Sequence, residues 1–373
     1  MSPDQALPPH LPDLRELQRR RRYRSKKQEK QKVNKTGEVR AALAEGRHLR
    51  ASKHTLSHWS DQQLQPLNEL RLTMSEEGRV AYVFPGQGSQ RVGMGRELYH
   101  SSPQARAVFE EADSALGFPL TRLCFEGPDE VLRQTSNAQP AILAVSIAYL
   151  RASPELQARV PAFVAGHSLG EYTALVAAQA LDFAQAIYLA RERGRLMQEA
   201  GDQNPGGMVA ILGLEEALVN DVCQVTGTQI ANMNCPGQIV ISGAAQDVAR
   251  AAELAKAKGA RSVIPLQVSG AFHSRLMQPA AEGMAQAVLN LAFRDPVIPV
   301  IANTTAQPLT RADAVKAELL HQLCHCVQWQ KSVEFMIHEG VSTFVEIGPG
   351  QVLTGLIRRA SKQAEVISTE GKG

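Results

Sequence analysis

The feature of this chain that most restricts its fold is a serine set between two glycines, where an expected strand meets an expected helix. Residues 162–166 (AFVAG) form a short apolar run that predicts a buried strand, and residues 170–181 (GEYTALVAAQAL) predict a helix. The segment 166–170 between them reads GHSLG and fits G-x-S-x-G, a tight turn in which only glycine tolerates the close backbone on either side. Such a strand–turn–helix unit predicts an α/β fold around a largely parallel sheet.

Ser168 in this turn has two possible roles. It could be an ordinary N-cap of the following helix, or a nucleophile whose hydroxyl projects over the sheet edge beside the unpaired N–H groups of the helix start. The flanking strand and helix favour the nucleophile, which needs a base. His273 is the favoured base because it follows an expected strand end and precedes a helix, whereas His167 is adjacent in sequence and should point away. The remaining downstream candidates are His321, His325 and His338.

The rest of the chain alternates between expected strands and helices. Strands are expected at 80–86, 296–303 and 342–348, and helices at 97–116, 138–152, 183–200 and 274–291. Residues 205–270 differ, because strand, helix, two strands, helix and strand follow one another in the ferredoxin-like order. We therefore expect an α/β-hydrolase-like catalytic subdomain with a parallel sheet, formed by residues 79–204 and 271–369, and an inserted ferredoxin-like subdomain at 205–270.

Charge is concentrated at the start of the chain. Residues 1–60 hold 15 lysines and arginines against 6 acidic residues, a balance of +9, so that the net charge of +3 leaves −6 for the remainder. Residues 1–78 are too polar to bury a core, and we expect a basic, flexible extension or linker. A nucleic-acid tail or a docking arm for an acidic protein are the alternatives. The early acidic residues disfavour a mitochondrial presequence.

Several classes of protein are disfavoured by composition. No run of 18 apolar residues is present, which predicts no transmembrane span, and the first residues lack the apolar stretch of a secretory signal. The five cysteines are scattered and odd in number, which predicts reduced thiols and a cytoplasmic location. Cys324-His325-Cys326 could suggest a metal site, but its one-residue spacing without a second cysteine pair does not fit zinc patterns, so we expect no metal.

Seven motifs between residues 80 and 369 together resemble one family. They are FPGQGSQ (84–90), TSNAQPAI (135–142), GHSLGEY (166–172), RGRLMQ (193–198), GAFHS (270–274), QLCHCVQW (322–329) and EIGPGQVLTGL (346–356). In order and spacing they resemble the malonyl-CoA:acyl-carrier-protein transacylases and the acyltransferase domains of polyketide synthases. The basic extension lies outside this likeness.

The resemblance implies a catalytic set. Ser168 would attack a thioester and carry the acyl group as an ester, with His273 as the general base. The backbone carbonyl of Gln322 would orient His273 in place of a carboxylate, which agrees with the lack of an obvious third acid. The backbone amides of Gln87 and Leu169 match the oxyanion hole of the family.

Four further residues are implied to bind the substrate. Arg193 matches the arginine that holds the free carboxylate of malonyl, a task suited to the two parallel donors of a guanidinium. Without the likeness, Arg193 would be interpreted as a surface arginine of the helix at 183–200. Phe272 matches the malonyl-type residue whose ring leaves no room for an α-methyl group. Gln139 matches a pocket glutamine, and Asn234 an asparagine at the subdomain edge.

The chain departs from the family at Cys326, where a proline is usual. We expect this change to loosen the loop that holds Gln322 and so to affect the placement of His273.

We therefore expect transfer of malonyl from malonyl-CoA to the phosphopantetheine thiol of an acyl carrier protein, for fatty-acid biosynthesis, by a monomer without a cofactor or a membrane contact. A polyketide acyltransferase acting in trans is one alternative. A serine esterase or thioesterase would share the turn but would have no use for Arg193. Nucleic-acid association through the basic extension stays open but disfavoured. A phosphate loop at GQGSQRVGMG is disfavoured because the G-K-[ST] ending is missing.

Overall fold

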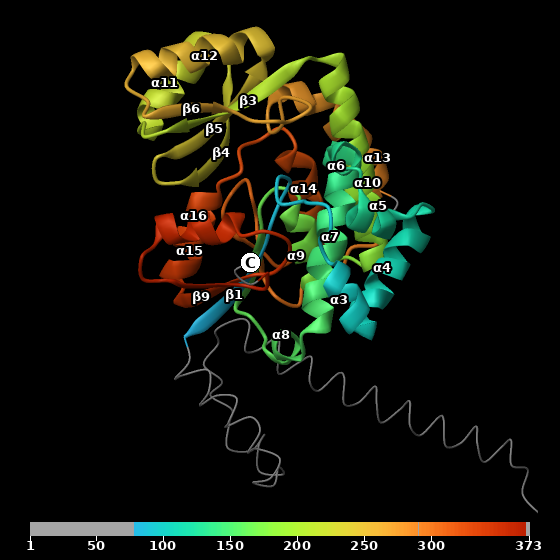
Figure 1. The fold of residues 1–373 in the computed structure, drawn as a ribbon. Helices are drawn as coiled ribbons and strands as arrows, with labels where there is room; N and C mark the ends of the chain where they lie inside the picture. Colours follow the sequence, from blue (N-terminus) through green and yellow to red (C-terminus); the bar gives the residue numbers. More distant parts are fainter. Residues whose placement is uncertain (1–77, 290, 371–373) are drawn as a thin grey trace, which may run out of the picture. The chain divides into compact units, whose positions relative to one another are not determined.

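The computed structural model describes residues 78–289 and 291–370 (Figure 1). The basic extension predicted at 1–78 lies outside the described residues, apart from Gly78. Among the helices of the described part, none is both long and apolar enough to span a bilayer.

A six-stranded sheet with the order β10-β9-β1-β2-β7-β8 positions the site. Its strands are β1 (Arg79–Phe84), β2 (Phe163–Gly166), β7 (Val300–Ile301), β8 (Pro308–Leu309), β9 (Val341–Glu346) and β10 (Glu365–Ser368). All neighbouring strands are parallel except the pair β7 and β8, which is antiparallel. The prediction of an α/β fold with a parallel sheet is therefore confirmed.

Alternating side chains of the central strands bury both faces of this sheet. Tyr82 and Phe84 belong to one apolar cluster, whereas Ala81 and Val83 belong to another, as the two-residue period of a strand requires. The helical elements that add side chains to the first cluster are α3 (Arg96–Ser101), α4 (Pro103–Leu116), α5 (Leu120–Glu126), α6 (Asp129–Arg133), α7 (Thr135–Ala152), α8 (Pro154–Ala158), α9 (Gly170–Ala177), α10 (Phe183–Gln203), the 3-10 turn η1 (Arg275–Met277), α13 (Gln278–Leu289) and α14 (Ala312–Gln322). The helices that add side chains to the second cluster are α15 (Trp329–His338) and α16 (Val352–Ala360).

A second sheet of four antiparallel strands has the order β4-β5-β3-β6. Its elements follow in the chain as β3 (Gly206–Leu212), α11 (Glu216–Thr226), β4 (Gln229–Cys235), β5 (Gln238–Ala244), α12 (Ala245–Ala257) and β6 (Ser262–Pro265). Apolar side chains of α11 and α12, among them Val219 and Ala251, pack with those of the strands in a third cluster. In Figure 1 these elements lie together, apart from the parallel sheet.

Several elements differ from the sequence predictions, and two of the differences have a local reason. The single helix expected at 97–116 is split at Ser102, whose hydroxyl caps α4 by accepting from the amide of Ala105, because Pro103 disfavours a helical residue before it. The strand expected at 296–303 is only β7, because Pro299 has no N–H for the ladder. Helices α5, α6 and α8 and strands β8 and β10 were not predicted.

Candidate active site

The turn between β2 and α9 holds Ser168 in a strained backbone conformation. Its φ of 52° lies in the left-handed region, which costs a non-glycine residue on the order of 1–3 kcal/mol. A Cβ atom at Gly166 would lie 1.8 Å from the carbonyl carbon of Gly170, and one at Gly170 would lie 2.1 Å from the carbonyl oxygen of Phe84. Both glycines are therefore required for the turn, which presents Ser168 at the carboxyl end of the parallel sheet.

His273 lies beside Ser168 although 105 positions separate them in sequence. Its Nε2 is 2.8 Å from Ser168 Oγ, and its Nδ1 is 2.8 Å from the carbonyl oxygen of Gln322. Because a carbonyl oxygen can only accept, Nδ1 carries the hydrogen and Nε2 accepts from the serine hydroxyl. The arrangement is that of a nucleophile and its base, with a backbone carbonyl as the third member.

The other histidines considered from the sequence lie elsewhere. The Nε2 atom of His167 is 2.9 Å from Asn234 Oδ1, so this ring points away from Ser168 as expected. His321 and His325 are exposed and stack on each other with ring centroids 3.3 Å apart. His338 is exposed beside its neighbour Glu339.

The pKa of His273 is lowered to about 3, mainly by burial and then by the positive charge of Arg193. The Gln322 carbonyl opposes this shift by accepting from Nδ1. The imidazole is consequently neutral at neutral pH and its Nε2 lone pair is available to accept a proton.

Arg193 is buried at the same place, with 1% of its surface exposed. One terminal nitrogen donates to Gln139 Oε1 at 2.7 Å, and the other donates to Gln322 Oε1 at 2.8 Å and to Ser168 Oγ at 3.0 Å. These acceptors are all neutral, and within the described ranges Arg193 forms no ion pair with a carboxylate. A buried guanidinium held in this way can bind an anionic group next to the serine.

Glu171 is the buried acid of this network and lies behind Gln322. One of its oxygens accepts from the Gln322 side-chain amide, and the other accepts from the Asn303 backbone N–H at 3.0 Å. Burial and then the nearby Glu318 raise the pKa of Glu171 well above its ordinary value. Burial therefore makes the neutral form of this carboxyl easier to reach than that of an exposed glutamate, and among the described residues Glu171 makes no direct contact with the Arg193 guanidinium.

The two amides predicted for the oxyanion hole come from the loop after β1 and from the turn itself. Gly86 lies so close to the turn that a Cβ atom would be 2.4 Å from the carbonyl oxygen of His167. Neither the N–H of Gln87 nor that of Leu169 donates to another group in the part of the chain that the structure describes. Both are therefore free to donate to an oxygen of a bound group.

The loop with Cys326 in place of the family proline is held by the antiparallel sheet. Val327 forms an isolated parallel bridge with β4, in which its N–H donates to Ala231 and its carbonyl accepts from Met233, both at 2.9 Å. These bonds restrain the segment after Gln322, so the loosening expected from Cys326 does not prevent the contact between Gln322 and His273. Residues 324–326 do not gather metal ligands, since no group of three suitable side chains occurs among the described residues.

The remaining predicted residues surround this centre. Gln139 holds Arg193 through Oε1 and approaches Met197 Sδ at 3.4 Å through Nε2. Phe272 is buried directly before His273, and Asn234 is buried against the His167 ring.

Sequence reasoning missed Asn303. Its Oδ1 accepts from the Ser168 backbone N–H, and its Nδ2 donates to the carbonyl of Gly166, both at 2.7 Å. It therefore ties both ends of the serine turn to the chain after β7. The signal that could have found it is its place as a polar residue ending the expected strand 296–303, where α/β sheets carry site residues.

Comparison with known proteins agrees with this geometry. Residues 81–371 match the acyl transferase domain family. The malonyl CoA-acyl carrier protein transacylase of Bacillus subtilis is 48% identical over 295 residues, which cover 78% of this chain and 93% of that protein.

Two solved structures are also similar. The acyl-carrier-protein-S-malonyltransferase of Bartonella henselae is 44% identical with a TM-score of 0.76, covering 79% of this chain and 96% of its own. A malonyl-transacylase solved in complex with a type II polyketide synthase acyl-carrier protein is 41% identical with a TM-score of 0.76, covering 78% and 95%. From its motifs, its fold and these likenesses, the chain belongs to the acyl transferase family, within the group of malonyl-CoA–acyl carrier protein transacylases.

Proposed function

We propose that this chain transfers a malonyl group from malonyl-CoA to the phosphopantetheine thiol of an acyl carrier protein, in fatty-acid biosynthesis. The observation that carries this proposal is the buried Arg193 guanidinium, 3.0 Å from Ser168 Oγ and held by neutral acceptors. An acyl group on Ser168 that ends in a carboxylate would place that carboxylate on the guanidinium, which can form two parallel hydrogen bonds with it. An esterase for uncharged acyl groups would gain nothing from a buried cation at this place.

In the first half-reaction, Ser168 Oγ attacks the thioester carbon of malonyl-CoA while its proton passes to His273 Nε2. Negative charge develops on the thioester oxygen, which accepts from the free N–H groups of Gln87 and Leu169. The carbon–sulfur bond then breaks, and the imidazolium returns its proton to the CoA sulfur. The Gln322 carbonyl keeps the ring in the required tautomer throughout.

In the second half-reaction, the thiol of the phosphopantetheine arm attacks the malonyl ester. His273 takes the thiol proton, and the departing Ser168 oxygen receives it when the ester bond breaks. The products are the malonyl thioester of the carrier protein and the free serine. The two substrates together with Ser168 and His273 supply every proton and every bond in these two half-reactions. The proposed reaction therefore uses malonyl-CoA as a substrate and needs no cofactor.

We propose that an α/β-hydrolase-like subdomain of residues 79–204 and 271–369 carries these groups, with a ferredoxin-like subdomain at 205–270. The chain order β3-α11-β4-β5-α12-β6 and the antiparallel strand order β4-β5-β3-β6 support the second assignment. Asn234 of β4 holds His167 next to the serine, which supports a place for the ferredoxin-like part at the substrate site. Phe272 is the residue proposed to limit the space at the α-carbon of the acyl group.

The pathway depends on the carrier protein that the enzyme accepts. The likeness to a malonyl-transacylase solved with a type II polyketide synthase acyl-carrier protein supports polyketide supply as the second candidate. A cytoplasmic location is supported by the five cysteines, all of which are free thiols.

Intact mass after incubation with malonyl-CoA tests the function. The wild type should gain one malonyl group, Ser168→Ala should gain none, and Ser101→Ala, an exposed serine of α3, should behave as the wild type. Addition of the phosphopantetheine form of a fatty-acid or polyketide carrier protein should then discharge the adduct to that carrier. An adduct that persists in Ser168→Ala, or that is lost to water faster than to any carrier, would overturn the proposal.

A further inference from the structure

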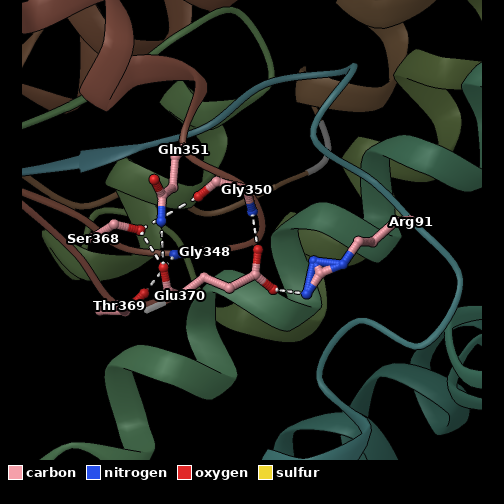
Figure 2. Close-up of polar contacts among 7 residues, drawn as sticks. All are labelled: Arg91, Gly348, Gly350, Gln351, Ser368, Thr369 and Glu370. Carbon is pink, nitrogen blue, oxygen red and sulfur yellow. Dashed lines mark hydrogen bonds and ion pairs between the residues drawn. The ribbon is translucent and has the colours of Figure 1, made fainter. Parts of the chain in front are cut away.

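The glycine-rich loop that carries Gln87 meets two other segments of the chain. This loop is formed by residues 86–91 after β1, and the other two segments are the loop 347–351 after β9 and residues 368–370 at the end of β10 (Figure 2). The three strands are consecutive parallel neighbours in the order β10-β9-β1, so their carboxyl ends lie at one edge of the sheet. This edge is the one that carries Ser168.

The second loop packs directly against the first. The N–H of Ile347 donates to the carbonyl of Val83 at 2.9 Å. Gly348 has a φ of 142°, and a Cβ atom there would lie 2.8 Å from Pro85 Cγ. A Cβ atom at Gly350 would lie 3.4 Å from Ser89 Cβ. Val83 and Pro85 directly precede loop 86–91 and Ser89 lies within it, so loop 347–351 borders the first half of loop 86–91.

Glu370 connects these two loops through the two oxygens of one carboxylate. Oε2 accepts from the N–H of Gly350 and Oε1 pairs with the Arg91 guanidinium, each at 2.5 Å (Figure 2). The backbone oxygen of Glu370 also accepts from the Gln351 side chain at 2.9 Å. Only 14% of the Glu370 side chain is exposed, whereas 55% of Arg91 is.

The residues before Glu370 are themselves fixed to the second loop. Thr369 donates through its N–H to the carbonyl of Glu346 at 2.9 Å and accepts through Oγ1 from the N–H of Gly348 at 3.1 Å. Ser368 Oγ approaches the carbonyl of Gly350 at 3.4 Å. Glu370 thus extends from an ordered strand end, which makes its carboxylate a defined anchor for Arg91.

We propose that Glu370 is a positioning residue for the oxyanion hole. By fixing Arg91 against Gly350, its carboxylate holds loop 86–91 so that the Gln87 N–H points to the oxygen that becomes negative during acyl transfer. The inference rests on the proposed function, in which the Gln87 amide is one of two oxyanion donors. An isolated surface ion pair would contribute little, but this carboxylate bridges two loops that pack on each other.

The oxyanion hole is sensitive to such support. A donor stabilises the transition state only when it lies at hydrogen-bonding distance from the charged oxygen, so a small displacement of loop 86–91 weakens it. Arg193 is held by Gln139, Gln322 and Ser168, none of which lies in this loop. Loss of Glu370 should therefore lower kcat and leave the KM for malonyl-CoA nearly unchanged.

The test compares Glu370→Ala, Glu370→Gln and Glu111→Ala in the full-length protein. Complete loss of one oxyanion donor costs about 10²–10³ in kcat, so its displacement in Glu370→Ala should cost about tenfold, in both half-reactions. Glu370→Gln keeps an acceptor for the Gly350 amide and loses the charge opposite Arg91, so its loss should be smaller. Glu111 pairs with Arg151 on the surface of α4 and α7, and Glu111→Ala should match the wild type.

Arg91→Ala should reproduce the kcat loss, and the double variant Arg91→Ala/Glu370→Ala should lose no more than the worse single variant, because both act through one contact. Glu370→Ala with kcat at the wild-type value would overturn the proposal, whatever its thermal midpoint, as would a loss confined to KM. If Glu370→Ala does not fold, Glu370→Gln and Arg91→Ala decide by the same criteria. A wild type that takes no malonyl from malonyl-CoA would instead refute the proposed function itself.

Discussion

Replacing Arg193 with methionine removes the buried charge beside Ser168 while keeping most of the side-chain volume. On the proposed function, the guanidinium binds the free carboxylate of malonyl, which acetyl lacks. The variant should therefore lose activity with malonyl-CoA and keep or gain activity with acetyl-CoA. The acetyl group should gain because methionine relieves the charge that faces it in the wild type.

The structure sets the size of this effect. Arg193 is 1% exposed, and a carboxylate bound to it would be similarly shielded from water. Removing one partner of a buried, hydrogen-bonded charge pair costs about 2–5 kcal/mol. At 1.36 kcal/mol for each factor of ten, the preference for malonyl-CoA over acetyl-CoA should fall by about 30-fold to 5,000-fold. Methionine leaves the Oε1 atoms of Gln139 and Gln322 without this donor, but it also removes a buried cation, so we expect the variant to fold.

Single-turnover acylation followed by intact mass measures kcat/KM for each acyl-CoA. Arg195→Met is the matched control, because Arg195 lies two residues further along α10, is exposed, and pairs with Glu192 and Glu199. It should leave the ratio of malonyl to acetyl unchanged. If Arg193→Met is folded and keeps the wild-type ratio, the guanidinium does not bind the acyl carboxylate and the reasoning fails.

Four further predictions follow from the site. Because the pKa of His273 is lowered to about 3, kcat/KM for acylation should stay level between pH 8 and 5, and a fall centred near 6.5, the ordinary pKa of histidine, would contradict this. In the unfolded chain the imidazole of His273 binds a proton below about pH 6.5, whereas in the folded chain it does so only near pH 3. The free energy of unfolding should therefore fall as the pH drops from about 6.5 to about 3, and urea unfolding of wild type and His273→Gln can measure the part that His273 contributes. Asn303→Ala leaves the Ser168 amide and the Gly166 carbonyl unpaired, at about 1–3 kcal/mol for each group, so the thermal midpoint and kcat should both fall; an unchanged kcat would separate Asn303 from the turn. Cys326→Pro should leave kcat within about twofold of the wild type, because the β4 bridge already restrains the segment after Gln322, and a large change would show that the bridge is insufficient.

The parts of the fold that local sequence determines could be predicted. Strands β1 and β2 are short, almost wholly apolar runs next to turn residues, and helices α7 and α10 are long, so their types could be assigned from the sequence. Strand β10 could not be found in this way, because four residues with one buried position carry no pattern and pair only once β9 is in place. Likewise, the splitting of the helix at Ser102 follows from Pro103 and could have been derived.

The site divides in the same way. The serine turn is local in sequence. Without the family likeness Arg193 was interpreted as a surface residue, although the structure places it on the buried stripe of α10 with Ala186, Ala190 and Met197. A charged residue on such a stripe needs a partner or a function. The contacts of Asn303 and Glu171 with the turn and with Gln322 join residues more than 130 positions apart, and no sequence spacing indicates them.

Gln322 connects the base with the substrate-binding cation, because it contacts both His273 and Arg193. Gln322 holds the imidazole with its backbone oxygen and the guanidinium with its side-chain oxygen. A carboxylate in place of that carbonyl would stabilise the imidazolium more strongly, but it would also lie close enough to Arg193 to compete with an acyl carboxylate for the same cation. Neutral acceptors hold Arg193 in position without satisfying its charge, so the strongest anionic partner available to it is the substrate. On the proposed function, the weaker support of the base is therefore the condition that keeps the carboxylate site open.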